Sequence, residues 1–122
     1  MRQSHAGVIQ KLQMHPPQNV SLCSVVLAEL YYGAERGETG RRAANLSLIQ
    51  QLRSRHPSLP FDDHAAEVWG SLRAHLAGAG TPIGPNDLLI AAIALANGVT
   101  LVTHNTREFS RVPGLQLEDW QA

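Results

Sequence analysis

The chain has 122 residues, of which 43% are hydrophobic and 16% are charged. This length and composition suit a single folded domain over residues 1–122 and exclude intrinsic disorder. Ten acidic residues balance ten basic ones, so the net charge is zero and gives no sign of a strongly basic nucleic-acid binder.

Helices dominate the predicted first half, because apolar residues recur there at helical spacing between proline and glycine breaks. The expected helices cover residues 1–14, 24–37 and 41–56, and a short buried strand covers 20–25. Ser24 is the expected N-cap of the second helix. In the third helix, Leu46, Ile49 and Leu52 form one apolar stripe.

The predicted second half contains two helices that follow an extended connector over residues 58–61. Asp62 or Asp63 is expected to cap the first of them. Pro85 suits the first position of the other helix, and Gly98 suits the C′ position that ends it.

Strands are predicted over residues 99–103 and 115–117, on either side of a polar loop over 104–111. Helices that alternate with short apolar strands are typical of an α/β domain with a mostly parallel sheet. We therefore expect this fold class.

The cysteine content and the apolar runs bear on location. Cys23 is the only cysteine, which excludes an internal disulfide, and the longest apolar run, 88–96, is shorter than the roughly 20 residues of a membrane span. No signal-peptide pattern opens the chain, so we expect a cytoplasmic protein.

Most acidic side chains have an ordinary explanation as solvated or helix-capping groups in polar turns, at helix starts or near the C-terminus. These eight are Glu35, Glu38, Asp62, Asp63, Glu67, Glu108, Glu118 and Asp119. The remaining two, Glu29 and Asp87, are each the only charge within a long apolar helical stretch. A buried carboxylate needs a counter-ion, a metal or a cleft. For Glu29 a salt bridge to an arginine is an alternative, and for Asp87 the favourable position in a first helical turn is another.

In a parallel sheet, helix starts lie beside the carboxyl ends of strands, where open α/β folds place their sites. Glu29 and Asp87 converging there could bind Mg²⁺ or Mn²⁺, with Thr103, His104 and Asn105 as further ligands. Such an ion activates water for phosphodiester hydrolysis. The histidine spacing excludes a helical zinc site, and most of the six histidines are expected on the surface.

Three stretches carry a family resemblance. They read V-L-A-E-L-Y-Y-G-A at 26–34, G-T-P-I-G-P-N-D-L-L-I-A-A at 80–92 and L-V-T-H-N-T-R-E-F at 101–109. With the residues from about 18 to the C-terminus, they closely resemble PIN-domain proteins of the VapC toxin type.

The resemblance implies a three-layer α/β/α domain and a Mg²⁺- or Mn²⁺-dependent endoribonuclease, the toxin of a type II toxin–antitoxin pair. Such proteins are usually homodimers inhibited by a VapB-like antitoxin. Glu29 and Asp87 match the family's glutamate and aspartate, which makes them the expected catalytic and metal-binding acids. Asn105 and Thr103 are expected to be weaker metal ligands.

The sequence departs from the family pattern at two places. The family's opening strand, the central one of its sheet, leads into Asp-Thr-Asn, and neither is found here, so we expect an N-terminally truncated domain. Either the translation start was assigned too far downstream or this is an inactive truncated copy. Asn105 stands where many members carry an acid. The alternative function is a non-catalytic module that binds an antitoxin or a second copy.

Overall fold

The computed structural model describes residues 21–37, 39–103 and 105–119, so the helix expected over 1–14 lies outside the described residues. The chain divides into two compact units. The N-terminal unit lies within residues 3–59, and the C-terminal unit lies within 60–122.

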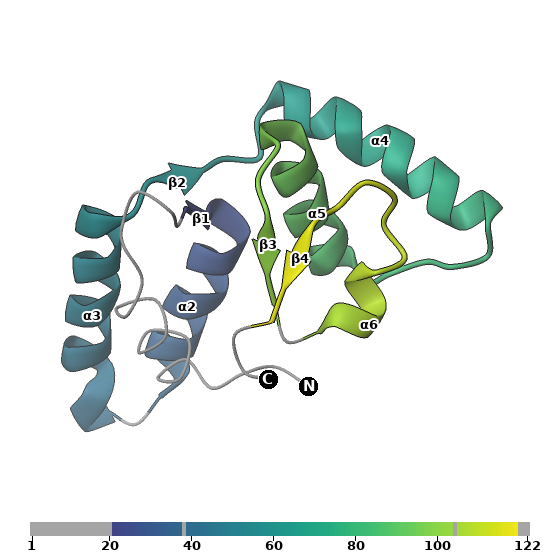
Figure 1. The fold of residues 1–122 in the computed structure, drawn as a ribbon. Helices are drawn as coiled ribbons and strands as arrows, with labels where there is room; N and C mark the ends of the chain where they lie inside the picture. Colours follow the sequence, from purple (N-terminus) through teal and green to yellow (C-terminus); the bar gives the residue numbers. More distant parts are fainter. Residues whose placement is uncertain (1–20, 38, 104, 120–122) are drawn as a thin grey trace. The chain divides into compact units, whose positions relative to one another are not determined.

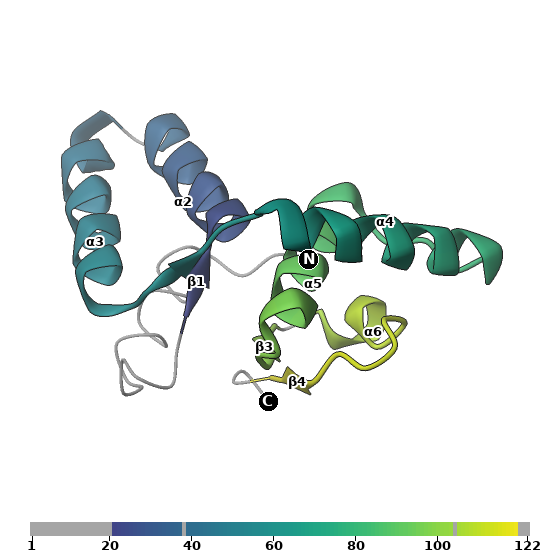
Figure 2. The same ribbon diagram turned by 90° about the horizontal axis from the view of Figure 1, so that it is seen from above.

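The N-terminal unit is a helical pair joined to a short parallel ladder. Its elements are β1 (Leu22–Cys23), α2 (Ser24–Arg36), the 3₁₀ turn η2 (Thr39–Arg41), α3 (Arg42–Arg55) and β2 (Ser58–Leu59). The strands β1 and β2 pair in parallel, with Leu22 opposite Ser58. Helices α2 and α3 lie side by side in both ribbon views (Figures 1 and 2).

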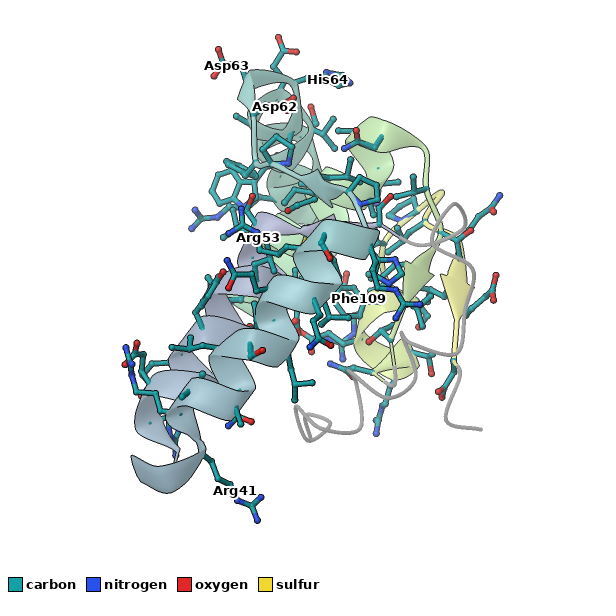
Figure 3. All side chains as sticks on the ribbon, turned by 90° about the vertical axis from the view of Figure 1, so that its left-hand side faces the viewer. Arg41, Arg53, Asp62, Asp63, His64 and Phe109 are labelled. Carbon is teal, nitrogen blue, oxygen red and sulfur yellow. The ribbon has the colours of Figure 1, made fainter. Side chains whose placement is uncertain are left out.

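A buried cluster holds the two helices of this unit together. Leu27, Leu30 and Ala34 from α2 meet Ile49 and Leu52 from α3, all at most 8% exposed. Arg41 and Arg53, labelled in Figure 3, are exposed near the two ends of α3. The predicted apolar stripe is therefore confirmed as the face that α3 buries.

His56 is a buried exception to the expectation that most histidines lie on the surface. It follows α3 directly and is 2% exposed, while His64 and His75 are exposed. Neither ring nitrogen of His56 has a hydrogen-bond partner within the described chain. The burial of His56 has a local cause, because Pro57 turns the chain from α3 into the β1–β2 ladder. The Pro57 carbonyl accepts there from the Leu22 amide at 2.7 Å.

The C-terminal unit places two long helices beside a second short ladder. Its elements are α4 (Asp63–Gly78), α5 (Pro85–Asn97), β3 (Leu101–Val102), α6 (Thr106–Phe109) and β4 (Leu117–Glu118). The strands β3 and β4 pair in parallel, with Leu101 opposite Leu117. Helix α4 packs against α5 (Figure 1), whose residues Leu88 and Ile90–Ala94 are buried.

The helix boundaries of this unit follow the predicted signals. Asp62 is the N-cap of α4, since its Oδ1 accepts from the Ala65 amide at 2.9 Å, and Asp62 and Asp63 project from this end of the helix in Figure 3. Pro85 begins α5, and Gly98 follows it with a φ of +63°, a left-handed conformation that favours glycine.

Two local predictions were wrong. Ser24 is the first helical residue and not the N-cap, and its hydroxyl donates to the Leu59 carbonyl at 3.5 Å. The polar loop over 104–111 contains the short helix α6. The extended connector over 58–61 begins with the strand β2, which pairs with β1.

The expected α/β class with parallel strands is confirmed, since both ladders described are parallel. Within the described ranges, no helix has the length and apolar character needed to cross a membrane.

Replacing Asp62 by alanine removes the capping acceptor of α4, and we expect the free energy of unfolding to fall by about 1 kcal/mol. Asp62→Asn keeps an acceptor at the cap and serves as the matched control. Urea denaturation followed by circular dichroism measures both. Equal losses in the two variants would contradict a capping role for this side chain.

Candidate active site

Two acidic side chains meet in the C-terminal unit. Asp87 lies in the first turn of α5, and Glu108 lies in α6. A Cβ built on Gly84 would lie 3.5 Å from Glu108 Oε1 and 3.7 Å from Asp87 Oδ2, so both carboxylates border the same point of the backbone.

Both oxygens of Glu108 are held by donors. The Gly84 amide donates to Oε1 at 2.5 Å, and the Asn105 side-chain amide donates to Oε2 at 2.8 Å. The Gly84 carbonyl accepts the first hydrogen bond of α5, from the Leu88 amide. The carboxylate is therefore fixed against the start of α5.

Helix α6 places Glu108 at this point because buried apolar residues lie at its last position and just after it. Phe109, labelled in Figure 3, and Val112 are each 3% exposed and contribute to the core of the unit. Asn105 immediately precedes the helix as its N-cap residue. The short helix is thus fixed by two core residues next to the acid that it presents.

The surroundings lower the pKa of Glu108. The largest cause is the hydrogen bond from the Gly84 amide, followed by those from Asn105 and Asp87 and by the positive charge of Arg111, while partial burial acts in the opposite direction. The site therefore favours an ionised Glu108 beside Asp87.

Thr103 and Asn105, the expected weaker ligands, lie directly after β3. The Thr103 hydroxyl accepts from the Asn105 amide at 3.0 Å, and the Thr103 amide donates to the Glu118 carbonyl. Asn105 uses its side-chain nitrogen on Glu108, which leaves its amide oxygen as an acceptor. The structure thus brings Asp87, Asn105 and Glu108 together, with Thr103 bonded to Asn105, while His104 lies outside the described residues.

Glu29 lies in the other unit, on α2, and is half-buried. Its charge acts on Cys23: the pKa of this thiol is raised mainly by burial and further by Glu29. The helix is less enclosed than the sequence predicted, since Ala28 is exposed and Tyr32 is 64% exposed. That Glu29 and Asp87 converge on one site stays a prediction.

The atoms of the site that could bind a metal ion are all oxygens. Across residues 21–37, 39–103 and 105–119, no three or more His, Cys, Asp and Glu side chains are grouped so that they could bind a metal ion. Two carboxylates with a nearby amide oxygen nevertheless fit a Mg²⁺-like ion, which binds through one or two carboxylates and keeps several of its waters. The chemistry of Asp87, Glu108 and Asn105 therefore suits the expected cation.

The assignment of Glu108 to a solvated polar loop was wrong. Its carboxylate is part of the site because the start of α5, distant in the sequence, supplies its first donor. One sequence signal was available: Asn105-x-x-Glu108 is a pattern that marks helix starts, and it follows a strand whose carboxyl end already held predicted ligands.

The stability of the protein at low pH tests whether Glu108 is ionised in the folded chain. Because its native pKa is depressed, its contribution to stability is fully present above the unfolded value of about 4.3 and is lost as the pH falls through the native pKa. Glu108→Gln should therefore lose less unfolding free energy on acidification than the parent chain. Urea denaturation between about pH 7 and pH 3 measures this, and parallel curves would contradict it.

Comparison with known proteins places the fold in a family. The model of the PIN domain family matches residues 2–115. The tRNA(fMet)-specific endonuclease VapC of Salmonella typhimurium is 44% identical over 99 residues, which cover 81% of this chain and 74% of the relative. The protein of the same name from Shigella flexneri is 48% identical over 99 residues, with the same shares.

A solved structure agrees with the sequence relatives. The crystal structure of VapBC2 from Rickettsia felis, bound to a DNA fragment from its promoter, matches with a TM-score of 0.79 and 37% identity over 93% of this chain and 85% of that chain. The expected resemblance is thereby confirmed: the chain belongs to the PIN domain family.

Proposed function

We propose that this chain is a divalent-metal-dependent endoribonuclease, the toxin of a VapBC-type toxin–antitoxin module, which hydrolyses RNA phosphodiester bonds in the cytoplasm. The observation that carries the proposal is the Asp87–Glu108 pair, held at the start of α5 in a PIN domain. Relatives 44% and 48% identical to the chain are named as endonucleases, which supports the same reaction class.

Asp87 and Glu108 would bind Mg²⁺ or Mn²⁺, with the Asn105 amide oxygen and the Thr103 hydroxyl as weaker ligands. When bound, such an ion supplies a water of lowered pKa and neutralises charge on the phosphodiester. Because donors occupy both oxygens of Glu108, its carboxylate has one orientation and its remaining lone pairs point in fixed directions. Asp87 and Glu108 then orient the attacking water toward the phosphorus.

Glu29 is proposed as a third acid of the same site. Its support is its isolation in an otherwise apolar stretch of α2 and its match to the family's glutamate. Its half-buried position is suitable for a carboxylate that faces a substrate cleft.

The relatives also indicate which substrate and partner to test first. Two of them are named for tRNA(fMet), and the Rickettsia felis structure contains VapBC2. We therefore propose a tRNA substrate and a VapB-like antitoxin partner for this chain. The homodimer expected from the resemblance stays a prediction.

Purified protein with Mn²⁺ is expected to cleave tRNA(fMet), and chelation by EDTA should stop the cleavage. Glu29→Gln, Asp87→Asn and Glu108→Gln should each lower the rate by about 100-fold or more, since a positioned acid contributes on this order. Gel analysis of end-labelled tRNA measures the rate. The matched control is Glu67→Gln, an exposed acid on α4.

Each outcome of this experiment decides a separate part of the proposal. Equal cleavage after Glu29→Gln would remove Glu29 from the site, and equal cleavage after Asp87→Asn or Glu108→Gln would refute the acid pair. Cleavage of other RNA with tRNA(fMet) left intact would reject only the substrate. A folded chain that binds antitoxin but never cleaves RNA would establish the non-catalytic module.

A further inference from the structure

We propose that Arg111 is a positioning residue of the site, which holds the segment 82–84 against Glu108. This inference rests on the proposed nuclease function and deepens it. Arg111 lies outside the three stretches, 26–34, 80–92 and 101–109, that carry the family resemblance.

The first observation is a hydrogen bond across the chain. Nη1 of Arg111 donates to the Pro82 carbonyl at 2.9 Å, although 29 residues separate the two. Pro82 stands two residues before Gly84, whose amide donates to Glu108. Arg111 thus binds the same short segment whose Gly84 amide donates to the Glu108 carboxylate.

The second observation is that Glu108 and Arg111, which both bond to the segment 82–84, lie in one turn. Glu108 and Arg111 are three residues apart in one turn, and the Arg111 amide bonds back to the Glu108 carbonyl at 3.2 Å. Side chains at this spacing project from the same side of a turn. Glu108 accepts from the Gly84 amide, and Arg111 donates to the Pro82 carbonyl. The turn over 108–111 therefore contacts both ends of the segment 82–84.

The hydrogen bond from Arg111 holds the start of a segment whose end is fixed by α5. The Gly84 carbonyl accepts from the Leu88 amide, and Ile83 is half-buried. Pro82 and Pro85 have no amide hydrogen and a restricted φ. Holding the Pro82 carbonyl therefore limits the remaining freedom of the Gly84 amide beside Glu108.

The first test needs neither RNA nor metal. In protein labelled with ¹⁵N-glycine, the Gly84 amide is assigned by its loss in Gly84→Ala. Arg111→Met keeps the aliphatic stem without donors, and we expect it to shift the Gly84 amide and to speed its hydrogen exchange by about fivefold or more, the effect of a weakened hydrogen bond. Arg111→Lys keeps a charge and a donor and should restore most of the parent signal.

The second test separates positioning from RNA binding. Arg111→Met should lower kcat by about tenfold, since a small displacement of a positioned group has effects of this order or larger, with KM within about twofold. Arg111→Lys should recover part of the loss. The matched control is Arg107→Met, an exposed arginine on α6 that should change neither measurement.

The outcomes distinguish this inference from the function on which it rests. An unchanged Gly84 amide in folded Arg111→Met, or a loss confined to KM, would overturn the positioning role. Should Arg111→Met fail to fold, Arg111→Gln is read by the same criteria. A parent chain that cleaves no RNA would overturn the proposed function, and the Gly84 amide alone would then decide whether Arg111 holds the segment.

Discussion

The hydrogen bond from the Gly84 amide to the Glu108 carboxylate is the contact on which the candidate site depends. It joins the loop before α5 to the helix α6, and therefore brings together residues that are 24 positions apart. The proline that follows Gly84 begins the helix that carries Asp87. Core residues on both sides hold the helices in place, so the acids meet without a flexible linker between them.

The balance of charges explains why so many donors surround one carboxylate. Two negative charges at a separation of about 4 Å would repel by about 4 kcal/mol at an effective dielectric constant of 20. Two hydrogen bonds to a charged group stabilise by about 1.5 to 3 kcal/mol each, or about 3 to 6 kcal/mol together, which is the same order as that repulsion. The Gly84 and Asn105 donors supply these two bonds.

Local signals in the sequence predicted local structure well. Pro85, Gly98 and the aspartate cap of α4 are each read from one or two neighbouring residues, and each lies where expected. Asp87 was selected by its isolation in an apolar helix, and its role in a site stays a prediction. Glu108 was assigned to a polar loop because its first donor, the Gly84 amide, comes from a distant segment, a contact that the local Asn105-x-x-Glu108 pattern does not report. The burial of His56 follows from the turn at Pro57, which the helical pattern does not specify. Sequence periodicity reports which face of an element is buried, whereas partners across the fold come from packing.

Cys23 gives the N-terminal unit a chemical property of its own. The nucleophile of cysteine chemistry is the thiolate, and both burial and the neighbouring Glu29 charge disfavour that form. A thiol in this state reacts slowly with alkylating agents and oxidants as long as the strand that carries it remains packed. The rate at which Cys23 is modified consequently reports how often the strand β1 opens to solvent.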